Sequence, residues 1–88
     1  MGIFDLFGLV NINQEIEKLK DIRDAVLIDV RSKEEFSQGH ILESLNIPLD
    51  EIQNIDKKVQ DRNTPIFLYC HSGVRSSKAA KILRKMGY

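Results

Sequence analysis

One strand–loop–helix segment, which contains the only cysteine, constrains the fold of this chain more than any other feature. The apolar run 66–69, Ile-Phe-Leu-Tyr, is rich in β-branched and aromatic residues and predicts a strand. A polar loop with a glycine follows, and the Ala- and Lys-rich stretch Ser77–Leu83 predicts a helix. The loop is therefore expected at the carboxyl end of a strand, where open α/β sheets bind their ligands.

Cys70 opens this loop, where backbone N–H groups are expected to converge with the start of the helix. A free thiol titrates at roughly 8.5, and such a position with cations nearby lowers that value. His71 and Arg75 are the nearest candidate cations, with Lys78 one helical turn further on. The pattern predicts a nucleophilic cysteine at neutral pH. The alternative is a buried structural cysteine among apolar neighbours, and the polar loop with its arginine favours the reactive interpretation.

Length and charge exclude several classes of protein. The 88 residues suffice for a single domain, expected to span 1–88, and 13 basic residues balance 13 acidic ones, so no overall field favours nucleic acid. One cysteine excludes an internal disulfide, and it forms no familiar zinc spacing with the two histidines. A reduced, cytoplasmic setting fits these observations best.

The rest of the chain alternates between apolar runs and amphipathic segments. The run Ala25–Val30 is typical of a parallel strand buried on both faces. A capping box formed by Ser32 and Glu35 predicts a short helix that Gly39 ends. The other predicted elements are a helix at 14–21 capped by Asn13, an extended piece at Ser44–Ile47 stopped by Pro48, and an amphipathic helix through Leu49, Ile52, Ile55 and Val59. This order predicts an α/β domain with a mainly parallel central sheet and helices on both faces.

The first ten residues are apolar but too few to span a bilayer, and they lack the basic flank of a signal peptide. No stable membrane insertion is therefore expected. Residues 1–11 are expected to form an N-terminal extension that packs against the core, or an edge strand around Leu9 and Val10. A weaker alternative is a membrane or partner contact through Phe4 and Phe7.

Five motifs in this order resemble the successive motifs of a single-domain rhodanese. They are Val26-Leu27-Ile28-Asp29-Val30-Arg31, Glu35-Phe36, Gly39-His40-Ile41, Asn46-Ile47-Pro48-Leu49, and Tyr69-Cys70-His71-Ser72-Gly73-Val74-Arg75-Ser76. The resemblance covers about residues 12–88. It implies a three-layer rhodanese-like domain, and five ordered motifs are far more specific than the cysteine loop alone.

The resemblance implies a sulfurtransferase. Cys70 would attack the outer sulfur of a donor such as thiosulfate, carry that sulfur as a persulfide, and pass it to a thiophilic acceptor, either cyanide or a thiol, including one on a protein. The backbone amides from His71 to Arg75 would stabilise the charge, and the Arg75 side chain would attract an anionic donor. His71, beside the nucleophile, is the more suitable functional histidine. No metal and no organic cofactor is implied.

Two other functions remain open. A cysteine-dependent phosphatase or arsenate reductase is the weaker enzyme hypothesis, because that pattern places five residues between cysteine and arginine. Here four intervene, namely His71, Ser72, Gly73 and Val74. The second alternative is a rhodanese-like module that binds partners or relays sulfur without turnover. Such modules often lack the cysteine, so the presence of Cys70 favours chemistry.

The remaining motif residues are expected to support the loop. Asp29 and Arg31 lie at the carboxyl end of a strand, where such side chains more often hydrogen-bond neighbouring loops than act in catalysis, and Arg31 is also placed to pair with Glu35. His40, after a glycine that ends a helix, is expected to bond backbone groups and brace the loop. Ser76 closes the cysteine motif as a supporting residue.

The sequence departs from the family pattern at two places. Leu42-Glu43-Ser44 replaces the usual Pro-Gly-Ala turn, so Glu43 is strained if that position needs a positive φ. Gly87 reads as the glycine that stops the last helix, and Tyr88 is the final residue, whereas rhodaneses continue into a strand beside the cysteine-bearing strand.

Without that strand, the segment Ile66–Tyr69 would keep an unpaired edge. The explanations are a truncated chain, a second chain that fills the gap, or another segment of this chain, for which Ile3–Val10 is a candidate. An unpaired edge predicts lowered stability and self-association.

Overall fold

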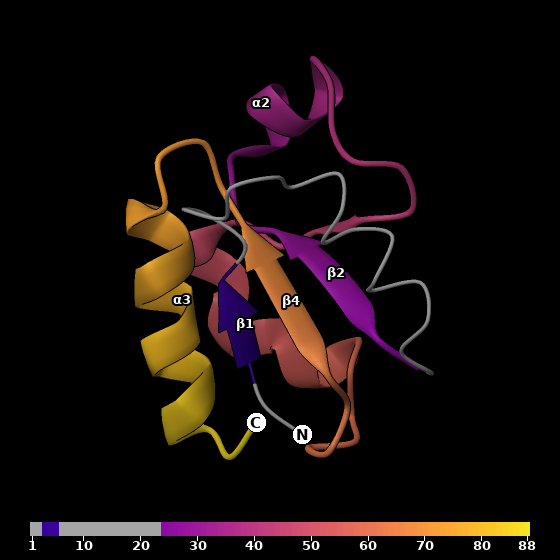
Figure 1. The fold of residues 1–88 in the computed structure, drawn as a ribbon, viewed down its shortest axis with the longest axis vertical. Helices are drawn as coiled ribbons and strands as arrows, with labels where there is room; N and C mark the ends of the chain where they lie inside the picture. The colour runs from indigo at the N-terminus through magenta and orange to yellow at the C-terminus, as the bar shows by residue number, and fades with distance from the viewer. Residues whose placement is uncertain (1–2, 6–23) are drawn as a thin grey trace.

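A computed structural model of the chain describes residues 3–5 and 24–88, and these form four strands, two α-helices and one 3₁₀ helix (Figure 1). The strands are β1 (Ile3–Asp5), β2 (Val26–Asp29), β3 (Leu45–Asn46) and β4 (Ile66–Tyr69). The helices are α2 (Lys33–Ser37), η1 (Leu49–Lys57) and α3 (Val74–Lys85). The helix expected over 14–21 and the edge strand expected around Leu9 and Val10 lie outside the described residues.

The four strands form one sheet in the order β1-β4-β2-β3, and every pair is parallel. β4 lies inside the sheet, with Ile66 opposite both Ile3 of β1 and Val26 of β2. The arrowheads of β2 and β4 point toward α2, so the carboxyl ends of the strands and the loops that follow them share one edge (Figure 1). The expected α/β fold with a parallel sheet is confirmed.

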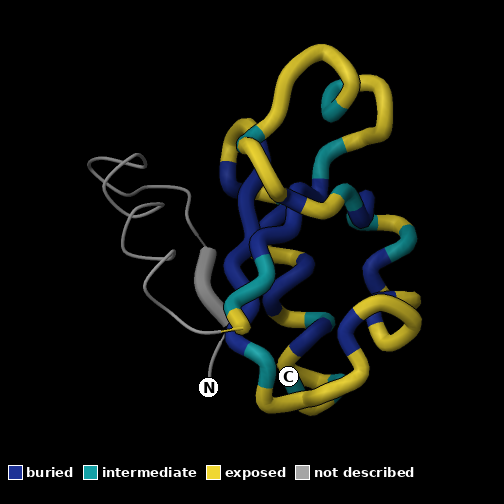
Figure 2. The backbone as a smooth tube through the Cα atoms, turned by 90° about the vertical axis from the view of Figure 1, so that its right-hand side faces the viewer, coloured by how far each residue is buried: buried dark blue, intermediate teal, exposed yellow. Residues whose placement is uncertain are grey.

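Side chains alternate between the two faces of β2 and β4 because successive residues of a strand point in opposite directions. On one face, Ile28, Ile66 and Leu68 form the main core with residues of η1 and α3. On the other face, Leu27, Phe67 and Tyr69 form a smaller cluster, flanked by Ala25 and Ile41. β2 and β4 are mostly buried, while the segments around α2 are mostly exposed (Figure 2).

β1 occupies the edge of β4 that we expected to be unpaired. Its three residues pair in register with Ile66, Phe67 and Leu68. The expectation of an unpaired edge on β4 is therefore wrong. The prediction of self-association through that edge loses its basis. The alternative, in which the segment Ile3–Val10 fills the position, is confirmed for Ile3–Asp5.

The segment after Pro48 forms a 3₁₀ helix, whereas its amphipathic pattern predicted a helix without specifying whether it is an α-helix or a 3₁₀ helix. Leu49, Ile52 and Ile55 are spaced by three residues, and a 3₁₀ helix aligns residues at that spacing on one side. Ile52 and Ile55 are fully buried against the sheet as a result. The bond from Glu51 N to Pro48 O, at 2.8 Å, shows the three-residue repeat at the start of the helix.

The expected start of α2 and the expected end of α3 are confirmed, whereas α3 begins at Val74, earlier than the predicted stretch Ser77–Leu83. Ser32 Oγ accepts the amide of Glu35 at 3.2 Å, and Glu35 Oε1 accepts the amide of Ser32 at 3.1 Å, which completes the capping box of α2. At the end of α3, Gly87 has φ +97°, and the amide of Tyr88 bonds back to Leu83 O. Within the described part of the chain, no helix is long and apolar enough to cross a membrane.

Glu43 has φ +69°, as the departure from the family turn suggested. It is the third residue of a tight turn closed by a 3.1 Å hydrogen bond from Ser44 N to Ile41 O. A side chain in this left-handed region costs about 1 kcal/mol or more, which glycine avoids.

We predict that Glu43→Gly raises the free energy of unfolding by roughly 0.5–1 kcal/mol, because the turn then adopts its φ without strain. Urea denaturation of the two proteins measures the change. Glu34→Gly is the matched control, since it places glycine inside α2 and should destabilise the protein. A fall in stability for Glu43→Gly would contradict the strained turn.

Candidate active site

Cys70 follows the last residue of β4 and is 8% exposed. The strand end is held by a hydrogen bond of 3.1 Å from Val30 N to Tyr69 O, so β2 fixes the backbone immediately before the cysteine. Three residues then turn the chain into α3, which begins at Val74. The sulfur therefore lies between the carboxyl edge of the sheet and the first turn of a helix.

Three hydrogen-bonding groups surround the sulfur. The amide of Gly73 donates to Cys70 Sγ at 2.9 Å, and the amide of Ser76 donates at 3.4 Å. The hydroxyl oxygen of Ser76 lies 3.5 Å from the sulfur. Cys70 is buried, as the structural alternative expected, but its sulfur contacts polar groups rather than apolar ones alone.

Gly73 has φ +85° and ψ −11°, a left-handed conformation that side chains rarely adopt. It is the residue before α3, and this conformation accompanies the 2.9 Å bond from its N–H to the sulfur. The backbone conformation that directs this N–H at the sulfur therefore requires a glycine at position 73.

The surroundings of Cys70 act on its pKa in opposite directions. Burial raises the pKa of the thiol, and the hydrogen bonds from Ser76 and from the amides of Gly73 and Ser72 lower it. The hydrogen bonds prevail, so the pKa of Cys70 lies below its ordinary value.

Ser76 can serve both protonation states of the cysteine. Its fully buried hydroxyl donates to Gly73 O at 3.2 Å while its oxygen can accept the thiol proton. When the thiol loses that proton, the same hydroxyl can rotate and donate to the sulfur.

The other loop residues lie at the surface. His71 and Ser72 are exposed, and Val74 is 56% exposed. We expected the amides from His71 to Arg75 to hold the sulfur, and those of Gly73 and Ser72 act on it together with the amide of Ser76, which lies beyond the expected range. The set extends one residue further into α3 because the first turn of the helix wraps around the sulfur.

Arg75 forms an ion pair with Glu35 of α2. Its Nη1 lies 2.5 Å from Glu35 Oε1, and its Nη2 lies 3.0 Å from Oε2. Hydrogen bonds from Arg75 and Ser32 lower the pKa of Glu35 to about 2. The expected local pair between Arg31 and Glu35 is therefore wrong. The prediction that Arg75 attracts an anionic donor stays untested, and its guanidinium keeps three N–H groups beyond the two that bond Glu35.

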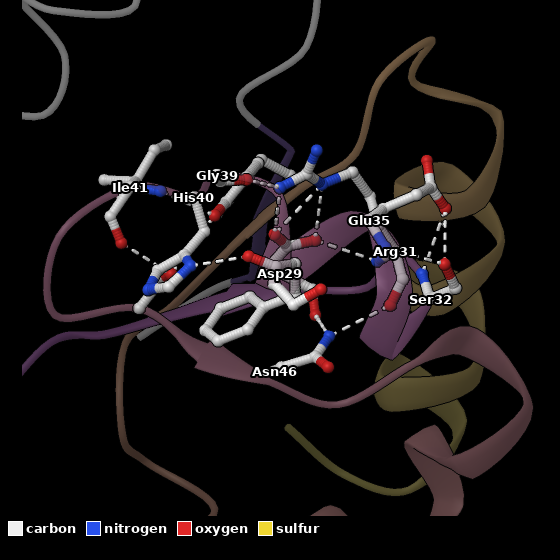
Figure 3. A network of polar contacts seen from close by, with 12 residues as sticks. Asp29, Arg31, Ser32, Glu35, Gly39, His40, Ile41 and Asn46 are labelled. Atoms are coloured by element: carbon white, nitrogen blue, oxygen red, sulfur yellow. Dashed lines mark hydrogen bonds and ion pairs between the residues drawn. The ribbon is translucent and has the colours of Figure 1, made fainter.

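Arg31 instead pairs with Asp29, at the center of the network in Figure 3. The Asp29 carboxylate, which is fully buried, accepts the amide of Arg31 at 2.8 Å and its Nη2 at 2.7 Å. The same nitrogen donates to Gly39 O at 2.7 Å. Asn46 Nδ2 donates to the backbone oxygens of Asp29 and Arg31 at 3.1 and 2.9 Å. These bonds join the ends of β2 and β3 to the segment after α2.

His40 bonds to the backbone and not to the sulfur loop. Its Nδ1 lies 2.7 Å from Phe36 O and carries the proton in that bond, because a carbonyl only accepts. The imidazole also stacks on the Phe36 ring, with centroids 3.6 Å apart. Both contacts fix the chain at the end of α2.

Two positioning residues were not predicted as such. The Tyr69 hydroxyl accepts the amide of Ile41 at 3.0 Å and lies 3.1 Å from Ser44 Oγ, so it ties the turn at 41–44 to the residue before the cysteine. Glu35 was predicted as a helix cap but not as the partner of Arg75. The two are 40 positions apart, and no local spacing connects them.

Comparison with known proteins decides the family. Residues 13–88 match the family described as rhodanese-like domain. The chain belongs to the rhodanese-like domain family. A rhodanese structure from E. coli superimposes on it with a TM-score of 0.69 at 40% identity, covering 73% of this chain and 76% of that one.

Curated relatives agree with this family. The thiosulfate sulfurtransferase PspE of Escherichia coli is 42% identical over 62 residues, covering 69% of this chain and 60% of that protein. The protein YqhL of Bacillus subtilis is 46% identical over 65 residues, covering 74% of this chain and 51% of that protein. The chain thus spans about half to three fifths of the length of these two relatives.

The described part of this rhodanese domain contains no group of three or more His, Cys, Asp or Glu side chains that could hold a metal ion.

We predict that Ser76→Ala raises the pKa of Cys70, because the thiolate loses a hydroxyl donor while the backbone amide remains. The rate of alkylation by iodoacetamide below the pKa should fall about two- to tenfold, the worth of one such hydrogen bond. A pH profile of that rate measures both quantities. Ser77→Ala changes the neighbouring exposed hydroxyl and should keep the wild-type profile. An unchanged profile in Ser76→Ala would show that the Ser76 hydroxyl does not lower the pKa of Cys70.

Proposed function

We propose that this rhodanese domain is a sulfurtransferase that moves a sulfane sulfur from a donor such as thiosulfate to a thiophilic acceptor through Cys70. The observation that carries the proposal is the sulfur of Cys70 held by the amides of Gly73 and Ser76. The name of the similar E. coli protein PspE, thiosulfate sulfurtransferase, supports the donor class.

The first step forms a persulfide. The Cys70 thiolate attacks the outer sulfur of thiosulfate, and a new S–S bond forms between them. The bond between the two sulfurs of thiosulfate breaks, and its electron pair leaves with sulfite. No external oxidant or reductant is needed, because the sulfur arrives in the oxidation state that the persulfide requires.

The second step returns the enzyme to its starting state. A thiolate acceptor, or cyanide, attacks the outer sulfur of the persulfide, and the bond between that sulfur and Cys70 breaks. The electron pair returns to Cys70 as a thiolate. The hydrogen bonds from Gly73 and Ser76 favour this product, since they lower the pKa of Cys70 and make it a good leaving group.

The spacing between Cys70 and Arg75 supports sulfur transfer over phosphate chemistry. Four residues separate the two, whereas the pattern of cysteine-dependent phosphatases has five.

The acceptor that we propose is a thiol, either on a small molecule or on a protein. A reducing compartment such as the cytoplasm would keep Cys70 free to react. The alternative, a module that binds partners or relays sulfur without turnover on small donors, shares the fold and is separated by the experiment below.

Intact-protein mass spectrometry after incubation with thiosulfate should show a gain of one sulfur atom, because the persulfide stays on the chain until an acceptor arrives. Cyanide or a reducing thiol should remove the added mass. Sulfite should appear in the amount of the sulfur taken up.

Cys70→Ser is the control and should gain nothing. If the wild-type protein, shown to be folded by circular dichroism, also gains nothing, the turnover proposal fails and the binding-module alternative takes its place.

A further inference from the structure

The ion pair between Glu35 and Arg75 connects α2 to the cysteine loop. Glu35 Oε1 accepts from Arg75 Nη1 at 2.5 Å and from the amide and hydroxyl of Ser32 at 3.1 and 3.0 Å. The carboxylate is thus fixed by the capping box at the start of α2 while it binds the guanidinium. A bidentate pair held on one side by a helix cap has little freedom to open.

Arg75 is a charged residue of the cysteine motif. It lies one residue before Ser76, whose amide and hydroxyl contact the sulfur. The pKa of Arg75 is raised first by its hydrogen bond to Glu35, and also by the charge of Cys70. The guanidinium and the thiolate therefore interact electrostatically, and Glu35 determines how much positive charge the loop presents.

Among residues 24–88, the other cations around the site have partners of their own or lie on the surface. Arg31 is bonded to the buried Asp29 carboxylate, and Lys33 Nζ lies 3.8 Å from Glu51 Oε2. Lys78 is exposed to solvent, where its charge is screened. Within that part of the chain, Arg75 is the cation best placed to change the charge preference of the loop.

We propose that Glu35 is a specificity-determining residue, which neutralises Arg75 and so limits the preference of Cys70 for anionic over neutral electrophiles. As a statement about sulfur donors, this inference rests on the proposed sulfurtransferase function. Loss of the Glu35 charge converts the loop into one that favours anionic donors such as thiosulfate, while neutral donors such as organic polysulfides are little affected.

The change Glu35→Gln tests the charge without removing the cap. A glutamine at this position of a capping box still accepts the Ser32 amide, so α2 keeps its start. The side chains of Glu35 and Arg75 are about one third exposed, and removing the charge leaves no buried unpaired guanidinium.

The experiment compares alkylation of Cys70 by iodoacetate, which is an anion, with alkylation by iodoacetamide, which is neutral. Both reagents consume the same thiolate, so the ratio of their rates cancels any change in the pKa of Cys70. In Glu35→Gln the ratio of anionic to neutral rates should rise at least about threefold, the effect of one unit charge several ångströms away in a high-dielectric site. Added salt should reduce the rise.

Glu34→Gln removes the same charge from the same turn of α2, where Glu34 is exposed. It should keep the wild-type ratio, which separates the ion pair from a general change in net charge. In the double variant Glu35→Gln/Arg75→Gln, the gain of Glu35→Gln should vanish, because the effect acts through Arg75.

Arg75→Gln alone provides a second, independent test. It leaves the carboxylate of Glu35 unbalanced, and the ratio should fall below that of the wild type. A ratio unchanged in both single variants, or an equal rise in Glu34→Gln, would overturn the proposal. None of these measurements needs persulfide formation, so failure of the sulfurtransferase proposal and failure of this one are distinguishable.

Discussion

The hydrogen bonds from the amides of Gly73 and Ser76 to the sulfur of Cys70 are the interaction on which the site depends. Burial alone would favour the neutral thiol, and the Ser76 hydroxyl together with these amides reverses its effect on the pKa. The amides point at the sulfur because Gly73 adopts a left-handed conformation and because α3 begins directly after it. The chemistry therefore follows from this backbone and from the hydroxyl of Ser76.

The rest of the fold holds this backbone in place. β4 is paired on both sides, by β1 and β2, and its buried residues fix the position from which the loop starts. The Asp29–Arg31 network joins the ends of β2 and β3 to the segment after α2, and Tyr69 ties the turn at 41–44 to the same edge of the sheet. Glu35 then connects α2 to the loop through Arg75, so three separate segments converge on the cysteine.

Local patterns in the sequence predicted most of the elements, because their causes are local. The apolar run before Cys70, the Ser32–Glu35 capping box and the positive φ of Glu43 each depend on neighbouring residues. Contacts between distant segments were harder to predict. No spacing rule pairs Ile3 with Ile66, and only the unfilled edge of β4 suggested that pairing. Likewise, Glu35 was placed beside Arg31 from proximity in sequence, whereas the folded chain brings Arg75 to it.

The hydrogen bonds to its sulfur should make Cys70 lose its proton more readily than an ordinary cysteine does. Ultraviolet titration of the single thiol, with Cys70→Ser subtracted to remove the tyrosine contribution, measures its pKa directly. The account predicts a midpoint below the value of roughly 8.5 for a free cysteine. A midpoint at or above that value would mean that burial outweighs the hydrogen bonds and would contradict the account.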